Sequence, residues 1–409
     1  MKQGWEIKKL GEVSIVFEDG DWIESKDQSI EGVRLIQTGN IGSGFFKDRG
    51  EKARYISEDT FKRLRCTEIF EDDCLISRLP DPVGRACVLP NTGEKMITAV
   101  DCTIIRFDKN KLMSEWFLLY SLSQEYQNGV NKQVSGATRQ RISRKNLGLI
   151  EIPLPPLPEQ QRIVAILDEA FAAIDKAKAN AQQNLQNAKE LFESYLQRVF
   201  ENKGEGWEEK SLGEILVKTE TVDPTKKPSE KFIYLDVSSV NKETKEIENA
   251  TVLMGKDAPS RARKLVRTND VIFATVRPTH SRVALITEEY DEQVCSTGYF
   301  VLRAKDFLNN NFVYYFLLTY SFNKQMEKLQ KGASYPAVTD AEVKGIVIPF
   351  PKLKKEQQTI VQKLDAINAE TKKLESIYQQ KINDLEELKK SVLQKAFAGE
   401  LKTDKVVAV

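Results

Sequence analysis

The chain contains the same sequence plan twice. Its opening stretch GWEIKKLGEV (Gly4 to Val13) recurs as GWEEKSLGEI (Gly206 to Ile215). Later, IPLP (Ile152 to Pro155) recurs as IPFP (Ile348 to Pro351), and Glu159-Gln160-Gln161 recurs as Glu356-Gln357-Gln358. The stretches between these motifs agree only in outline. A repeat of this length predicts a pseudo-two-fold molecule, which suits a partner that presents two similar sites.

Length and composition support two or more domains without a membrane anchor. A chain of 409 residues is too long for one ordinary core. We find no apolar run near the roughly 18 residues that a membrane span needs, and no apolar leader follows Met1, so we expect a soluble cytoplasmic protein without membrane contact. Five cysteines are unevenly divided between the halves and never form a Cys-x-x-Cys motif (Cys66, Cys74, Cys87, Cys102 and Cys295). We expect reduced, mostly buried thiols.

The net charge of +1 conceals two basic stretches, one in each half. From Tyr126 to Ile150 the chain has no Asp or Glu, and from Lys256 to Arg282 basic residues outnumber Asp257 and Asp270. The location of charge matters more for nucleic-acid binding than its total does. Each half therefore carries a candidate basic surface.

Two segments show the three- and four-residue apolar spacing of long helices. In the first the spacing runs from Ile163 to Val199, and in the second it runs from Ile360 through Leu374 and Leu388 to Ala396. Pro158 suits a first helical position, and Gly204 suits a helix end. Helices of about 40 residues would be about 60 Å long. Pseudo-symmetry favours their antiparallel packing as a coiled coil that holds two domains apart; the alternative is that they are core helices of two separate bundles.

The remaining segments read as mixed α/β domains, which gives an α+β fold class. Strand-like runs are found at 33–36, 74–77, 102–107, 232–235, 271–274 and 299–302. Aromatic helical stretches follow at 116–120 and 312–318, and we interpret these as core packing and not as base-stacking platforms. The expected domains are a first mixed domain (1–157), a first long helix (158–203), a second mixed domain (204–353), a second long helix (354–400) and a tail (401–409).

Polar loops in both domains carry residues suited to contact duplex DNA. Glycine allows close approach to a phosphate, a hydroxyl can bond a phosphate oxygen, and arginine can bind guanine O6 and N7 together. The alternative for any single residue is a solvated surface position. The candidates are Arg78, Arg85, Lys132, Thr138, Arg139, Arg141 and Arg144 in the first half, and Arg261, Arg263, Arg277, Arg282, Lys331, Ser334 and Tyr335 in the second.

No catalytic or metal-binding constellation is recognisable in the sequence. It lacks the Asn/Asp-Pro-Pro-aromatic motif that holds a flipped adenine, and it lacks a Gly-x-x-x-x-Gly-Lys-Ser/Thr phosphate loop. The single histidine, His280, stands between Arg277 and Arg282, where a DNA-facing loop is the better interpretation. We therefore expect no catalytic residue and no metal ligand.

At this point the repeated motifs, the long helices and the ending LQKAFAGEL (Leu393 to Leu401) together resemble the DNA-specificity subunit of a Type I restriction-modification system. The resemblance spans essentially the whole chain. It implies two target-recognition domains that each read one half of a split target in double-stranded DNA. It further implies two modification (methyltransferase) subunits docked on the helices, and a restriction subunit that moves and cuts DNA. S-adenosylmethionine, ATP and Mg would then be bound by the partner subunits. The second copy departs from the first at Lys352 to Lys355, where the first has Pro156-Leu157-Pro158, so the start of the second helix is less sharply defined.

The sequence leaves two other functional classes open. One is a non-catalytic coiled-coil scaffold with incidental DNA affinity, which would bind DNA without regard to sequence. The other is a self-sufficient DNA-modifying enzyme, which would be active as a purified chain.

Overall fold

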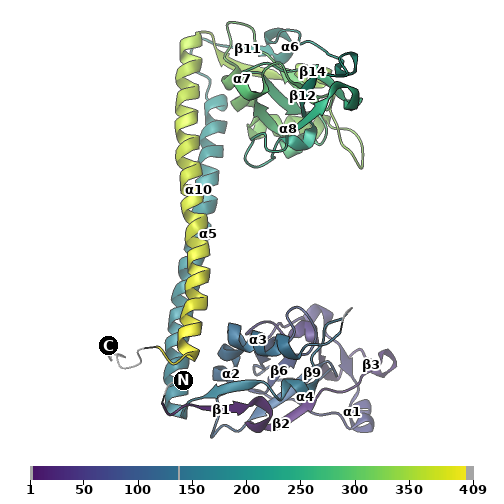
Figure 1. The fold of residues 1–409 in the computed structure, drawn as a ribbon, viewed down its shortest axis with the longest axis vertical. Coiled ribbons are helices and arrows are strands. Elements are labelled where there is room, and N and C mark those ends of the chain that lie inside the picture. The colour runs from purple at the N-terminus through teal and green to yellow at the C-terminus, as the bar shows by residue number, and fades with distance from the viewer. Residues whose placement is uncertain (1–2, 137–138, 402–409) are drawn as a thin grey trace. The chain divides into compact units, whose positions relative to one another are not determined.

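The structure, a computed structural model, describes residues 3–136 and 139–401 and divides into two compact units. Unit 1 comprises Met1–Ala181 together with Gln380–Val409, and unit 2 comprises Gln182–Gln379. Each unit contains one mixed α/β domain and a segment of each of two long helices, α5 (Leu157–Glu201) and α10 (Lys354–Phe397) (Figure 1). The α+β fold class predicted from the sequence is confirmed.

The mixed domain of unit 1 contains three small sheets. A two-stranded sheet pairs β1 with β10, a four-stranded sheet has the order β2-β9-β6-β7, and a second four-stranded sheet has the order β3-β5-β4-β8. The strands are β1 (Glu6–Lys9), β2 (Ser14–Asp19), β3 (Gln28–Ser29), β4 (Val33–Ile36), β5 (Tyr55–Ile56), β6 (Cys74–Ser77), β7 (Ala86–Val88), β8 (Met96–Thr98), β9 (Cys102–Phe107) and β10 (Glu151–Leu154). The short helices are α1 (Glu58–Leu64), α2 (Ser114–Ser121), α3 (Gln124–Gln133) and α4 (Arg144–Leu147).

The mixed domain of unit 2 follows the same plan with fewer strands. Its sheets have the orders β11-β19, β13-β12-β17-β14 and β16-β15-β18. The strands are β11 (Trp207–Ser211), β12 (Lys231–Leu235), β13 (Thr251–Met254), β14 (Ala262–Leu265), β15 (Val271–Ala274), β16 (Val283–Leu285), β17 (Val294–Ser296), β18 (Tyr299–Leu302) and β19 (Val347–Pro351). The short helices are α6 (Leu212–Ile215), α7 (Asn310–Leu317), α8 (Tyr320–Leu329) and α9 (Asp340–Lys344).

The two domains share a central strand pair in matching register. Cys74 of β6 lies opposite Ile105 of β9, and Val271 of β15 lies opposite Leu302 of β18; both pairings are antiparallel. Next to each strand pair, an arginine and a buried aspartate form a bidentate ion pair. The Arg106 guanidinium donates to both oxygens of the buried Asp73 carboxylate at 2.7 Å, and Arg303 does the same to Asp270 at 2.7 and 2.8 Å. The duplication therefore extends to buried polar contacts.

Within each unit the long helices run antiparallel. In unit 1 Lys178 pairs with Glu386 at 2.6 Å, and Asp175 pairs with Lys389 at 2.8 Å. Residue numbers therefore fall along α5 in the direction in which they rise along α10. In unit 2, Leu196 and Phe200 near the end of α5 share a core with Val361 and Leu364 near the start of α10. This confirms the predicted packing of the two helices on each other.

Aromatic residues predicted to pack in the core do so. Trp116, Phe117 and Tyr120 of α2 and Phe312 and Phe316 of α7 are all buried. All five cysteines are free and buried, as expected from their spacing.

The predicted seam of the second helix is wrong at two positions. Leu374 and Leu388 were placed in it by their spacing, but their exposed fractions are 36% and 47%. Lys389 lies at the helix contact instead, with its ammonium 4.7 Å from the centroid of the Phe171 ring. A long lysine stem can cover apolar surface while its charge stays in water, and a simple apolar repeat does not reveal this.

Candidate nucleic-acid interface

A short hairpin loop projects from the same place in each domain. In unit 1, Ser135 and Arg141 exchange two backbone hydrogen bonds of 2.9 Å, and in unit 2, Lys331 and Ala337 exchange two of 2.9 Å. Each loop turns through a glycine with positive φ, +102° at Gly136 and +107° at Gly332. A Cβ at Gly136 would lie 2.3 Å from the carbonyl oxygen of Arg139, so only glycine fits there.

Each hairpin rests on the loop that follows the central strand. The Ile142 N–H donates to the Arg78 carbonyl at 3.3 Å, just beyond the end of β6. In unit 2 the Val338 N–H donates to the Thr275 carbonyl at 2.9 Å, just beyond the end of β15. The fold therefore brings together, in each unit, two loops that the sequence marked separately.

In unit 1 this junction gathers four arginines around two aspartates. Arg141 lies 3.0 Å and Arg139 3.9 Å from carboxylate oxygens of Asp101, and Arg78 lies 3.3 Å and Arg144 3.8 Å from oxygens of Asp19. The cluster keeps a positive excess because the arginines outnumber the carboxylates. Arg139, Arg141 and Arg144 are exposed, whereas Arg78 is buried and burial lowers its pKa.

An open concavity of about 740 Å³ adjoins this cluster. Its basic lining comes from Lys9, Arg78, Arg144 and Lys145, with Asp19 and Glu12 as its acidic members. Lys145 belongs to the basic stretch 126–150 noted in the sequence, whereas Lys9 was not among the residues considered for DNA contact. A lysine in the opening repeat gives no local signal that it will face a loop more than a hundred residues further on.

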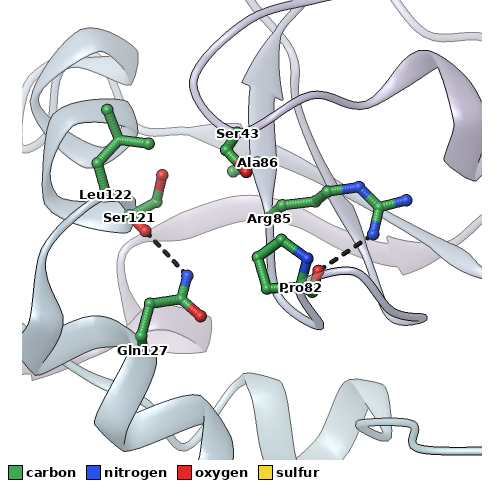
Figure 2. Close-up of a pocket in the computed structure, with 7 residues that line it drawn as sticks. All are labelled: Ser43, Pro82, Arg85, Ala86, Ser121, Leu122 and Gln127. Atoms are coloured by element: carbon green, nitrogen blue, oxygen red, sulfur yellow. Dashed lines mark hydrogen bonds between the residues drawn. The ribbon is translucent and has the colours of Figure 1, made fainter. Parts of the chain in front are cut away.

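Arg85 has a different environment. Its guanidinium donates to four backbone carbonyls, those of Ile41 (2.8 Å), Leu79 (2.7 Å), Pro82 (3.0 Å) and Thr38 (2.8 Å). Figure 2 shows it beside Pro82 in the wall of a small cavity of about 240 Å³. With these donors engaged and only 8% of the residue exposed, Arg85 tethers the loop that precedes it.

In unit 2 the junction is built from different side chains. Arg277 lies in the loop after β15 with its guanidinium carbon 5.1 Å from the centroid of the Tyr335 ring, which belongs to the hairpin. Ser334 is exposed in the same hairpin, and Lys331 at its base pairs with Glu342 at 2.9 Å. Arg282 is half-buried and donates to the Val240 carbonyl, so it also tethers its loop.

The other sequence candidates lie outside these junctions or cannot be placed. Lys132 is exposed in the last turn of α3. Arg261 is exposed just before β14, and Arg263 within β14 is half-buried and lies 3.5 Å from Asp223. Thr138 lies outside the described residues.

Two residues that sequence reasoning missed help shape the junctions. Asp101 holds Arg139 and Arg141, and Lys245 donates its ammonium to the Ser281 carbonyl at 2.7 Å at the end of the Arg277 loop. Burial lowers the pKa of Lys245 to about 8. Neither residue lies in a basic stretch or a repeated motif, so only the folded chain reveals them.

In residues 3–136 and 139–401, no cluster of His, Cys, Asp and Glu side chains has the arrangement of a metal site. The helices of the same residues include none that is long and apolar enough to cross a membrane.

Comparison with known proteins places the chain in a family. Residues 2–185 and 204–387 each match the family described as "Type I restriction modification DNA specificity domain". The chain is 24% identical to the Type I restriction enzyme EcoKI specificity subunit of Escherichia coli K12, over 98% of this chain and 90% of that protein. It is also 24% identical to the MjaVIII specificity subunit of Methanocaldococcus jannaschii, over 76% and 75% of the two chains.

Two solved structures share the fold. One, from a study of complex assembly and conformational transition of the Type I restriction-modification system, has a TM-score of 0.78 at 19% identity and covers 98% of this chain and 99% of its own. The HsdS subunit of Thermoanaerobacter tengcongensis has a TM-score of 0.65 at 19% identity and covers 98% of each chain. With the family matched in both halves, the chain belongs to the Type I restriction-modification DNA specificity subunits, the non-catalytic members of their complexes that recognise the DNA target.

Proposed function

We propose that this specificity subunit reads a target in two parts, with one half-site assigned to the hairpin junction of each unit. The observation that carries the proposal is that one main-chain arrangement occurs twice with different side chains. Unit 1 presents arginines held by Asp101, and unit 2 presents Arg277 on Tyr335. A shared scaffold with different contact residues is what two different half-sites require.

We use the burial and hydrogen bonds of each candidate to choose the residues proposed to touch DNA. We keep these candidates as proposed DNA contacts: Lys132, Arg139, Arg141, Arg144, Arg261, Arg263, Arg277, Lys331, Ser334 and Tyr335, with Thr138 carried from the sequence. We assign Arg78, Arg85 and Arg282 to shaping the loops, because each is buried or half-buried and its guanidinium group donates to the carbonyl of a residue distant in the chain. Such arginines are costly to redirect to a ligand because their carbonyl partners would lose hydrogen bonds. Arg144 and Arg263 also donate to carbonyls, but Arg144 is exposed and the acceptor of Arg263 is its neighbour Ala262.

The proposed partners follow from the family and from the duplicated frame. Two modification subunits would dock on the two copies of the helical frame, and a restriction subunit would join the complex. S-adenosylmethionine would serve the modification subunits, and ATP and Mg would serve the restriction subunit. Double-stranded DNA as the target implies a cytoplasmic location.

The proposal is tested by co-expressing the chain with the modification subunits of its own system and mapping methylated positions in the host DNA. We expect one motif with two specified parts. Replacing residues 204–353 by the corresponding segment of another specificity subunit should change one part and leave the other intact. DNA binding that ignores sequence, without co-purification of a modification subunit, would instead favour a scaffold.

Salt dependence tests the role of the unit 1 junction. If Arg141 neutralises a phosphate, Arg141→Ala should reduce the slope of log affinity against log salt by about one, measured for the assembled complex by fluorescence anisotropy. Glu125→Ala, an exposed acidic change on α3 of the same unit, is the control and should not reduce the slope. An unchanged slope for Arg141→Ala would remove this residue from the phosphate contacts.

A further inference from the structure

Arg277 and Tyr335 form a contact that the first unit does not repeat. Counting from the base of each hairpin, the position of Tyr335 corresponds to Arg139, which lies near a carboxylate and not over a ring. Tyr335 is 72% exposed although it is a large aromatic residue, and Arg277 is also exposed. A side-chain pair in water gains little stability, so this contact contributes little to holding the fold together.

The main chain beneath this pair is fixed on both sides. The Arg277 N–H donates to the Pro336 carbonyl at 2.7 Å, which ties the loop to the hairpin. Arg277 has a φ of +50°, a left-handed conformation that is unusual for a residue with a side chain. At the other end, the Asn323 side-chain amide donates to Ser281 Oγ at 2.7 Å. Such conformations persist where surrounding contacts enforce them, and they concentrate at ligand sites.

The charges that act on His280, in the same loop as Arg277, are positive. The Arg277 guanidinium makes no ion pair or hydrogen bond with another described residue, so its N–H donors remain available. His280 in the same loop has a pKa below its ordinary value because of partial burial and the positive charges of Arg277, Lys242 and Arg282. The loop therefore presents a positive surface with unused, fixed donors.

Building on the proposed function, we propose that Arg277 reads a guanine in the major groove of one half-site and that Tyr335 is the residue that positions it. The Tyr335 ring lies 5.1 Å from the guanidinium carbon, and a guanidinium plane parallel to that ring would leave its edge free to donate outward. Guanine O6 and N7 form the matching pair of acceptors, and this bidentate contact discriminates strongly between bases.

The test uses the complex of this chain with the modification subunits of its own system, after the wild-type motif has been mapped. Duplexes carry 7-deazaguanine, which lacks the N7 acceptor, at one guanine of the motif at a time. We expect the wild-type methylation rate to fall about tenfold at one guanine, in line with the roughly 5- to 150-fold that a bidentate contact contributes. Arg277→Ala should abolish the sensitivity to that substitution.

Variants of the two residues separate reading from positioning. Arg277→Lys keeps the charge but lacks the planar pair of donors, so it should lose the same sensitivity. Tyr335→Phe keeps the ring and should behave as wild type, whereas Tyr335→Ala should retain assembly and lose much of the discrimination. Lys226→Ala, which removes an exposed charge outside both loops of unit 2, is the control and should leave the motif unchanged.

Three results would overturn the inference. A uniform loss of methylation for every sequence in Arg277→Ala, with the 7-deazaguanine sensitivity retained, would make Arg277 a phosphate contact. Wild-type discrimination in Tyr335→Ala would remove its positioning role. A mapped motif in which no guanine depends on Arg277 would contradict this inference alone, whereas a wild-type complex that yields no two-part motif would contradict the proposed function itself.

Discussion

At the scale of residues, one buried glutamine in each repeat explains why the Glu-Gln-Gln motif recurs. Gln160 accepts the Met113 N–H at 3.0 Å and donates to the Lys111 and Pro155 carbonyls, both at 2.8 Å. Gln357 accepts the Asn309 N–H at 2.8 Å and donates to the Phe307 and Pro351 carbonyls at 3.2 and 2.8 Å. Both residues are fully buried. Each ties the start of a long helix to the loop that leads into the aromatic helix of its domain.

Replacing Gln357 by Leu should therefore leave three backbone groups without this partner, one buried and two part-buried. We expect the free energy of unfolding of unit 2 to fall by roughly 2–4 kcal/mol, because each unsatisfied buried group costs about 1–3 kcal/mol and some will recover water. Urea denaturation followed by circular dichroism measures this. Gln358→Leu changes the exposed neighbouring glutamine and should shift stability by less than about 0.5 kcal/mol. Equal effects of the two variants would contradict the role given to Gln357.

At the scale of elements, the end of each long helix completes the aromatic core of a recognition domain. The Phe397 ring at the end of α10 packs on Trp116 and Tyr120, with ring centroids 4.8 and 5.1 Å apart. Phe200 at the end of α5 packs on Phe312 and Phe316 at 5.0 and 5.5 Å. The apolar spacing predicted both helices. In α10 it wrongly assigned the exposed Leu374 and Leu388 to the buried face, and in α5 it missed the buried Leu196 and Phe200. At the helix ends the partner is a globular domain and not a second helix, so the buried face changes direction there.

We accordingly expect Phe397→Ala to destabilise unit 1 by about 3–5 kcal/mol, the usual cost of a large cavity in an aromatic core. The loss would be measured as a lower urea midpoint and as faster amide hydrogen exchange in α2. Leu388→Ala on the same helix is the matched control and should cost little, because that side chain is 47% exposed. A Phe397→Ala protein with wild-type stability would show that the ring contacts contribute no net free energy.

At the scale of the whole molecule, the chain has two domains that share a main-chain plan and differ in their loops. The helical frame consists of α5 with 45 residues and α10 with 44, an almost equal pair. Under the proposed function, the length of these helices sets the number of unread base pairs between the two half-sites.

Adding one heptad to both helices, opposite each other, should therefore lengthen the unread spacer by about three base pairs. Seven helical residues add about 10 Å, and a base pair rises about 3.4 Å along the duplex. Mapping methylated positions in cells that carry the altered complex measures the spacer directly. Adding the heptad to α10 alone is the control, and it should abolish methylation because the helices lose register. An unchanged spacer in the double insertion would refute the link between helix length and spacing.

The sequence by itself determined the duplication, the two long helices, the central strands and the buried aromatic helices, because apolar spacing and repeated motifs act locally along the chain. The tertiary structure alone decided the surroundings of each candidate DNA contact. Arg85 and Arg141 look alike in the sequence, yet one donates to four carbonyls inside a domain and the other is exposed beside Asp101. Burial and partner choice depend on residues that are distant in the chain, and no local pattern encodes which of them will meet.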